Sequence, residues 1–149
     1  MKNLRKMIVG IVALMEVMFS MAYNTQVYAA PTIEETILTQ VNSVREERGL
    51  KKLTVNAELT KAAKTRANES SLFYSHKRPN GTEWYTVNNS LMGETLYRGS
   101  ESFDPNEYCV SMWKDSKVHY EIMTLDNITS AGIAVCYENG TYYVAMVVA

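Results

Sequence analysis

The stretch Gly132-Ile-Ala-Val-Cys-Tyr-Glu-Asn-Gly-Thr-Tyr-Tyr-Val-Ala-Met-Val-Val148 decides the fold of this chain. Its two halves are rich in β-branched and aromatic residues, and they flank Asn139-Gly140, the dipeptide most typical of a two-residue hairpin turn. We therefore predict an antiparallel hairpin at the C-terminal end. Its alternating Tyr and Val side chains are expected to fill a sheet rather than to form a binding stripe.

Helix signals dominate the chain before this hairpin. Pro31-Thr32-Ile-Glu-Glu35 has the pattern of a capping box, and apolar residues follow it at helical spacing as far as Gly49. Asn56 caps a second predicted helix, which has a face of small residues. Asp104-Pro105-Asn-Glu107 starts a third helix. Helices that precede a sheet favour an α+β domain in which the helices cover an antiparallel sheet.

The segment between the second and third helices carries weaker signals. Residues 83–91 are polar and irregular, with at most a short strand near Trp84–Val87, and Gly93 to Tyr97 is predicted as a brief strand or a turn. The sequence contains no internal repeat and no sign of a second domain.

The first 29 residues have the features of an export signal. Basic residues precede an apolar stretch over residues 7–21, and Val27-Tyr28-Ala29 supplies small residues for a cleavage site. We predict a signal peptide over residues 1–29 and one domain over residues 30–149, secreted or held at the cell surface, with no transmembrane anchor after cleavage. An uncleaved amphipathic N-terminus is the alternative.

Composition excludes some partners and leaves one question of redox state open. The 149 residues include 15 Lys and Arg against 16 Asp and Glu, and no basic face stands out, so we expect no nucleic-acid partner. We expect a monomer that binds an unidentified extracellular ligand. The two cysteines, Cys109 and Cys136, either form a disulfide, which export allows, or remain buried thiols.

Three residues form the candidate site. The only two histidines of the chain are His76, before a turn, and His119, which is predicted near the end of a helix, where the helix dipole favours the cationic form. Glu94 follows Gly93, so the backbone there can approach another element closely. Two imidazoles and a carboxylate suit zinc with an open position, and they suit acid/base chemistry equally well. Trp84 is a candidate for the rim of the cleft.

Spacing alone does not bring these residues together, but six motifs in order give a resemblance that covers about residues 33–149. The motifs are Val41-Asn-x-x-Arg45-x-x-x-Gly49-Leu50, Leu53-x-x-Asn56-x-x-Leu59, Ser75-His76-x-Arg78-Pro79-x-Gly81, Gly93-Glu94, Trp113-x-x-Ser116-x-x-His119 and Gly132-Ile-Ala-Val. The chain resembles the CAP superfamily (cysteine-rich secretory proteins, antigen 5 and pathogenesis-related 1 proteins), and in particular its bacterial SCP-like extracellular branch.

The resemblance implies a three-layer α-β-α sandwich with a cleft that holds two histidines and two acidic residues. His76, Glu94 and His119 match three of these four positions, and Ser116 lies near the place of the missing glutamate. Other polar positions of the family pattern differ as well: Thr95, Asn80, Glu121 and Ala145 stand where the family usually has Asn, Asp, Asn and Gln.

Three functions follow as hypotheses. The first is a binding module in which His76, His119 and Glu94 bind a divalent metal such as zinc, or a small ligand that Trp84 also contacts, with Glu94 either as a ligand or as the residue that orients a histidine. The second is a peptidase-like hydrolase, in which Glu94 or a histidine acts on a water molecule. The third is a structural or host-interaction protein with a vestigial cleft. The sequence does not decide whether the protein is an enzyme.

Overall fold

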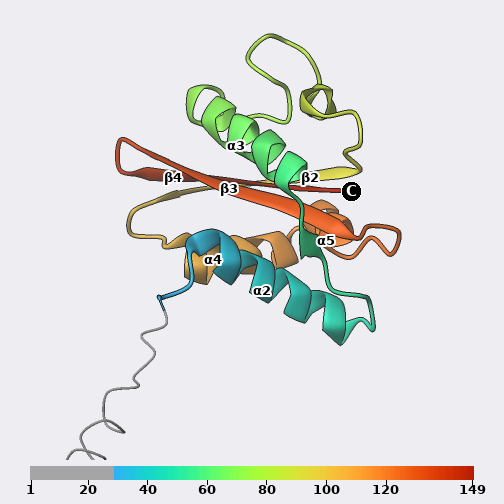
Figure 1. Ribbon diagram of the computed structural model, residues 1–149. Helices are drawn as coiled ribbons and strands as arrows, with labels where there is room; N and C mark the ends of the chain where they lie inside the picture. The colour runs from blue at the N-terminus through green and yellow to red at the C-terminus, as the bar shows by residue number, and fades with distance from the viewer. Residues whose placement is uncertain (1–28) are drawn as a thin grey trace, which may run out of the picture. The chain divides into compact units, whose positions relative to one another are not determined.

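A four-stranded sheet forms the middle layer of the computed structural model, which describes residues 29–149 (Figure 1). Its strands, in spatial order, are β1 (Thr54–Val55), β3 (Ser130–Glu138), β4 (Thr141–Val148) and β2 (Gly93–Ser100). The three long strands are antiparallel, as predicted. The short β1 was not predicted, and it pairs in parallel with the start of β3, so the complete sheet is mixed.

The predicted hairpin is confirmed. Glu138 pairs with Thr141, and the two turn residues both have positive φ angles, 50° at Asn139 and 72° at Gly140. A two-residue turn of this kind matches the right-handed twist of the strands on either side, which is why Asn-Gly is favoured there.

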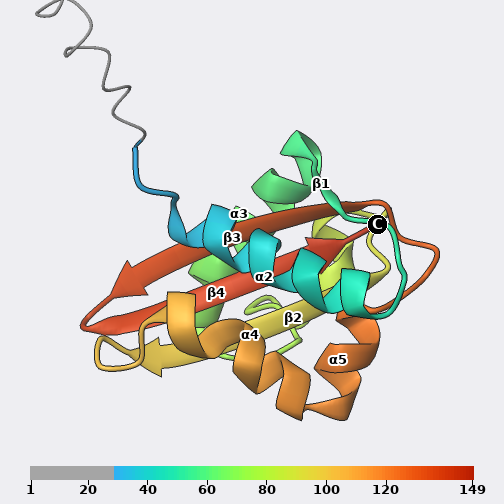
Figure 2. The same ribbon diagram turned by 90° about the horizontal axis from the view of Figure 1, so that it is seen from below.

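Helices cover both faces of the sheet, which confirms the α-β-α sandwich. Figure 1 shows α3 (Ala57–Leu72) on one face, and α2 (Ile33–Glu47) and α4 (Pro105–Asp115) on the other. Figure 2 views the α2 and α4 side, where α5 (Lys117–Met123) follows α4 near the start of β2. The predicted caps are present: Thr32 and Glu35 form both bonds of a capping box, and Asp104 accepts from the N–H of Asn106.

Two apolar cores fill the space between the layers. Ile133, Val144 and Trp113 belong to the core beneath α2 and α4, while Ala134 and Ala145 belong to the core beneath α3. The core beneath α3 is thin because its side chains are small, so helix and sheet come into close contact. At Gly132 a Cβ atom would lie 2.1 Å from the carbonyl carbon of Leu59; any larger residue would push α3 off the sheet.

Three details differ from the sequence prediction. Trp84–Val87 is a 3-10 helix, not a strand. The helix that begins after Asp104 does not continue to His119 but ends at Asp115, because Ser116 adopts an extended backbone (φ −97°, ψ 117°) before α5 begins. The brief strand or turn expected at Gly93 is a full strand of eight residues.

The N-terminal region adds little to the described structure. The predicted signal peptide, residues 1–29, lies outside the described residues except for Ala29. Pro31–Ala149 forms one compact unit. Within the described residues, no helix combines the length and the apolar character needed to cross a membrane.

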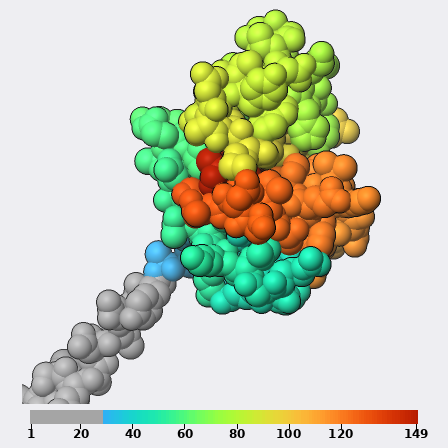
Figure 3. All heavy atoms as spheres, turned by 90° about the vertical axis from the view of Figure 1, so that its right-hand side faces the viewer, coloured from blue at the N-terminus to red at the C-terminus, as the bar shows by residue number. Residues whose placement is uncertain are grey.

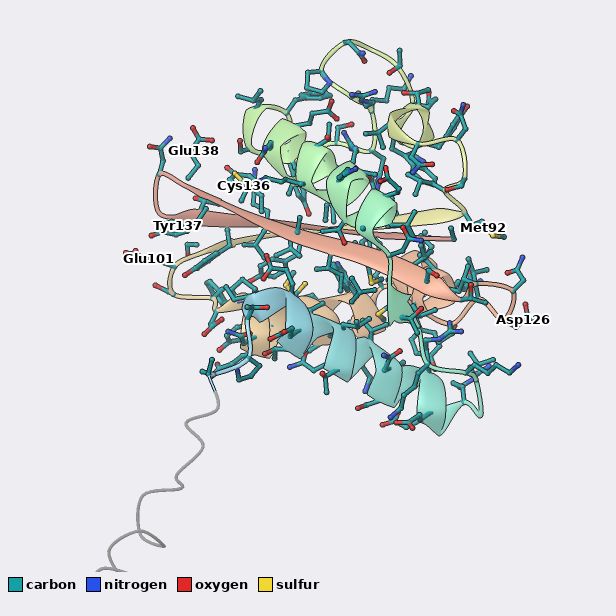
Figure 4. All side chains as sticks on the ribbon, in the orientation of Figure 1. Met92, Glu101, Asp126, Cys136, Tyr137 and Glu138 are labelled. Carbon is teal, nitrogen blue, oxygen red and sulfur yellow. The ribbon has the colours of Figure 1, made fainter. Side chains whose placement is uncertain are left out.

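The two cysteines are free thiols. Cys109 is fully buried in the core beneath α2 and α4, whereas Cys136 packs against the core beneath α3. Figure 4 shows Cys136 on the α3 side of β3. The sheet therefore separates the two sulfur atoms, and the disulfide that the sequence left open is not formed. Burial raises the pKa of the Cys109 thiol well above its ordinary value.

Candidate functional site

Glu94 lies at the centre of the site, and it is a buried carboxylate. Strand β2 directs its side chain toward α3, where only 1% of it is exposed. Arg66 of α3 donates from Nε to Oε2 of Glu94 at 2.6 Å and from Nη2 to Oε1 at 3.3 Å. A buried charge needs such a partner, because an isolated carboxylate in an apolar core is very unfavourable.

Arg66 joins Glu94 to the loop that carries the first histidine. Its Nη2 also donates to the backbone carbonyl of Ser75 at 2.7 Å, and its Nη1 donates to Glu69 at 2.6 Å. Glu69 in turn accepts from Nε and Nη2 of Arg78, at 2.9 and 2.7 Å. Two arginines and two glutamates thus fix both ends of the loop around His76.

The pKa values in this network reflect the pairing. Burial alone would lower the pKa of Arg66, but hydrogen bonds and charges from Glu94 and Glu69 outweigh it, so the pKa is raised. Burial alone would raise the pKa of Glu69, but Arg78 and Arg66 outweigh it and lower the pKa. Both shifts favour the charged forms of Arg66 and Glu69.

His76 contacts Glu94 directly. Its Nδ1 lies 2.8 Å from Oε1 of Glu94, while 52% of the histidine side chain remains exposed. Because Arg66 already donates to both oxygens of Glu94, the carboxylate acts as acceptor and Nδ1 of His76 is the donor. This contact fixes the ring orientation and leaves Nε2 as the free nitrogen in the neutral form.

His119 faces His76 from the other side of the β2 edge. The two ring centres are 6.1 Å apart, with an angle of 51° between the ring planes. His119 lies in the first turn of the short helix α5, so the prediction that it lies near a helix C-terminus, with its cationic form favoured by the dipole, is wrong. Its pKa is lowered instead, first by burial and then by the charge of His76.

A close approach between β2 and α5 brings the two histidines together. A Cβ atom on Gly93 would lie 2.7 Å from Cγ2 of Ile122, so this position needs a glycine for α5 to pack where it does. The close approach predicted for the backbone before Glu94 is confirmed. Figure 3 faces this side of the molecule, where the yellow loop before β2 rests against the orange segment of α5 and its neighbours.

A small hollow of about 250 Å³ lies at this junction, and it has an apolar mouth. His76 and Glu94 line it together with Trp84, Met92, Gly93, Val118 and Ile122. The backbone N–H of Trp84 donates to the carbonyl of His76, which places the indole beside the histidine. Met92 is 47% exposed and points outward at the end of the sheet (Figure 4).

Arg66 is a functional-site residue that the sequence did not predict. Arg66 was not among the candidate residues, although it holds Glu94 in place. A signal existed, because Arg66 is the one charged residue on the face that α3 presents with Ala62, Ala63 and Ala67. A cation on a face of alanines that packs against a sheet requires a buried acid opposite it.

The positions that depart from the family pattern lie mostly outside the hollow. Thr95 is buried on the opposite face of β2 from Glu94, and Ala145 belongs to the core beneath α3. Glu121 points away from the histidines toward Arg48 and Leu50, as expected from its position two residues after His119. Ser116 joins α4 to α5 and makes no side-chain cap bond.

The structure offers fewer candidate metal ligands than the sequence suggested. Within residues 29–149, no group of three or more His, Cys, Asp or Glu side chains is arranged to hold a metal ion. Glu94 already accepts bonds from Arg66 and His76, which leaves two imidazoles as the direct donors. Two imidazoles bound to one zinc at about 2.1 Å place their ring centres roughly 5 to 6 Å apart. The observed separation of 6.1 Å is close to that range.

Comparison with known proteins identifies the family. The model of the cysteine-rich secretory protein (CAP) family matches residues 38–149. The chain belongs to this family. No curated protein sequence matches this CAP protein.

Solved structures agree on the fold. An outer surface protein from Borrelia burgdorferi is 17% identical, with a TM-score of 0.60, and the match covers 77% of this chain and 91% of that one. An extracellular protein with an SCP domain from Bacillus anthracis is 15% identical, with a TM-score of 0.58; the match covers 81% of this chain but only 45% of the Bacillus protein. The structure of NaASP2 with Zn²⁺ is 15% identical, with a TM-score of 0.61 and coverage of 83% and 82%. At identities this low, the structural similarity shows a common fold and nothing about function.

Proposed function

We propose that this CAP protein is an extracellular binding module whose cleft binds a divalent cation, with zinc as the best candidate. The histidines supply the protein ligands, Nε2 of His76 and a ring nitrogen of His119. Glu94 orients His76 from behind. The observation that carries the proposal is the 2.8 Å contact between His76 and a carboxylate that Arg66 holds buried.

The arrangement of Arg66, Glu94 and His76 is typical of a prepared metal ligand. A histidine that binds zinc usually donates its other ring N–H to a carboxylate or carbonyl, which fixes the tautomer and makes the free nitrogen a better donor. His119 contributes a second nitrogen, and its lowered pKa keeps that ring neutral, as a ligand must be. The solved CAP structure of NaASP2 contains Zn²⁺, which supports this choice of metal.

Two protein ligands leave open coordination positions on the metal. A bound zinc would act there as a Lewis acid for a small ligand, and the apolar mouth formed by Trp84, Met92 and Val118 would contact the rest of that ligand. Such a site binds zinc more weakly than a closed structural site with four ligands, because fewer protein groups share the binding energy.

Glu94 is a poor general base, which disfavours the form of the hydrolase hypothesis in which Glu94 itself acts on a water molecule. A base must reach the proton that it removes, but one oxygen of Glu94 accepts from Nε of Arg66 and the other accepts from His76 and Nη2 of Arg66. Both carboxylate oxygens therefore already accept hydrogen bonds from Arg66 and His76.

The proposal is tested by calorimetric titration of the metal-free protein with ZnCl₂ at pH 7.5. We expect one zinc per chain, and at least tenfold weaker binding in His76→Ala/His119→Ala. The matched control is Lys77→Ala/Lys117→Ala, which truncates an exposed neighbour of each histidine and leaves zinc binding unchanged. Stoichiometric zinc that survives the loss of both histidines would contradict the proposal.

A further inference from the structure

The sheet has one edge that the described residues leave open. Strand β1 covers only the first two residues of β3, since the parallel pairing stops where Val55 meets Ala131. Ala131 directs its carbonyl to that edge, where it accepts from Asn56. Backbone groups of alternate strand residues point to the same side, so those of Ile133, Val135 and Tyr137 also face this edge.

These backbone groups have no partner on that side. Among residues 29–149, neither N–H nor C=O of Ile133, Val135 or Tyr137 makes a hydrogen bond across the open edge. The opposite edge of the sheet is partly covered, because Trp113 of α4 donates from Nε1 to the carbonyl of Leu96 at 2.9 Å and the N–H of Phe103 donates to the carbonyl of Ser100. An open edge with unpaired backbone groups is a template for an additional strand.

A groove of about 510 Å³ runs along this open edge, with lining residues from both α2 and α3. Figure 1 shows these two helices on opposite faces of the sheet. We call it the β3 edge groove. Its floor is apolar and consists of Leu38, Val55 and the β3 residues Ala131, Ile133, Ala134 and Val135. Its two walls carry opposite charges, with Glu34 and Glu35 on α2 and Lys64 on α3.

We propose that the β3 edge groove binds an extended segment of another polypeptide, which adds a strand to β3 in line with β1. Backbone hydrogen bonds to Ile133, Val135 and Tyr137 hold the segment, as in other cases of strand addition. Side chains of an added strand alternate between the two walls. Apolar residues therefore face Leu38 and Val135, and acidic residues face Lys64, with a basic residue toward Glu34.

The charges favour a different polypeptide over a second copy of this chain. Antiparallel pairing of two β3 strands about a two-fold axis places each helix layer beside the same layer of the partner. Glu34 would then approach the α2 wall of the other copy, which is also acidic, and Lys64 would approach a basic wall. Like charges across such an interface oppose association. A segment with a basic residue toward Glu34 and acidic residues toward Lys64 instead places opposite charges at both walls.

The test uses the full-length chain and a fluorescent peptide, Ac-Thr-Val-Glu-Val-Glu-Lys-NH₂, in an anisotropy titration. Two N-methylated forms of the peptide, each methylated at one alternate set of residues, are the critical comparison. We expect one form to bind at least tenfold more weakly and the other within twofold of the parent, since only one set of N–H groups faces β3. The proposal would be overturned if both methylated peptides lost affinity equally, or if the parent peptide bound with a Kd above about 1 mM.

Protein variants then locate the site. Lys64→Glu reverses the charge on the α3 wall and is expected to weaken binding about tenfold at low salt. Lys61→Glu is the matched control, because Lys61 lies on the same helix but pairs with Glu58 and does not line the groove. If Lys64→Glu and Lys61→Glu weakened peptide binding equally, the peptide would not be bound in the β3 edge groove. A dimer in sedimentation velocity that Val135→Pro dissociates would assign the edge to a second copy and overturn the proposed occupant.

Discussion

Nε of Arg66 lies 2.6 Å from Oε2 of Glu94, and both side chains are almost completely buried. This ion pair crosses the interface between α3 and the sheet, so the residue that orients His76 is also part of the core. The site and the packing of the domain therefore depend on each other. A change in the carboxylate should alter both the stability of the fold and the histidine beside it.

Glu94→Gln should destabilise the protein by about 3 kcal/mol. The substitution removes one of the two carboxylates that pair with the buried Arg66 and leaves only Glu69. Urea unfolding at pH 7 measures the change in the free energy of unfolding. The control is Glu58→Gln, which breaks an exposed pair with Lys61 and should cost less than about 1 kcal/mol. A cost for Glu94→Gln no larger than that of the control would show that the pair is not structural.

Gly93→Ala should destabilise the protein by about 1 to 3 kcal/mol, because the new methyl group meets Cγ2 of Ile122 at 2.7 Å. The same substitution in an Ile122→Ala background should cost less than about 1 kcal/mol, since the obstructing side chain is gone. Chemical denaturation of the four proteins in this cycle gives the coupling. Equal costs in the two backgrounds would mean that β2 and α5 do not pack through Gly93.

His76→Ala should raise the pKa of His119 in the metal-free protein. Burial and the charge of His76 both lower that pKa, and the substitution removes the charge and opens the site to water. Because the folded-state value lies below the unfolded one, the unfolded chain binds more protons between the two values. The free energy of unfolding therefore rises with pH through that window. NMR titration of the His119 ring measures the shift, with Lys77→Ala as the control, and an unchanged or lower pKa would contradict this geometry.

Cys136 should react with Ellman's reagent in the native protein, whereas Cys109 should react only after unfolding. Cys109 is fully buried and Cys136 is half-buried on the other side of the sheet. Cys136→Ala should leave no thiol that reacts in the native state, and Cys109→Ala should leave one. Denatured, unreduced protein that shows no free thiol would reveal a disulfide and contradict the structure.

Local signals predicted most of the fold. The capping box at Thr32, the cap at Asp104 and the turn at Asn139-Gly140 each depend on residues a few positions apart, and all three are present. The break at Ser116 was missed because no glycine or proline marks it. That break places His119 in the first turn of α5 instead of at a helix end, and its pKa is lowered by burial and by the charge of His76.

The site was less predictable because its contacts are not local. His76 and Glu94 are 18 residues apart, and Arg66 reaches Glu94 over 28 residues. The motif order indicated which residues belong together but not their roles. Whether Glu94 binds a metal or orients a histidine depends on Arg66, which lies outside all six motifs.

The most direct test of zinc binding by the two histidines is a crystal structure of the protein soaked in ZnCl₂, with anomalous diffraction measured at the zinc edge. We expect one anomalous peak bound by His76 and His119, with Glu94 still paired with Arg66 and outside the coordination sphere. Absence of a peak between the two histidines at saturating zinc, or a zinc bound elsewhere on the chain, would contradict this expectation.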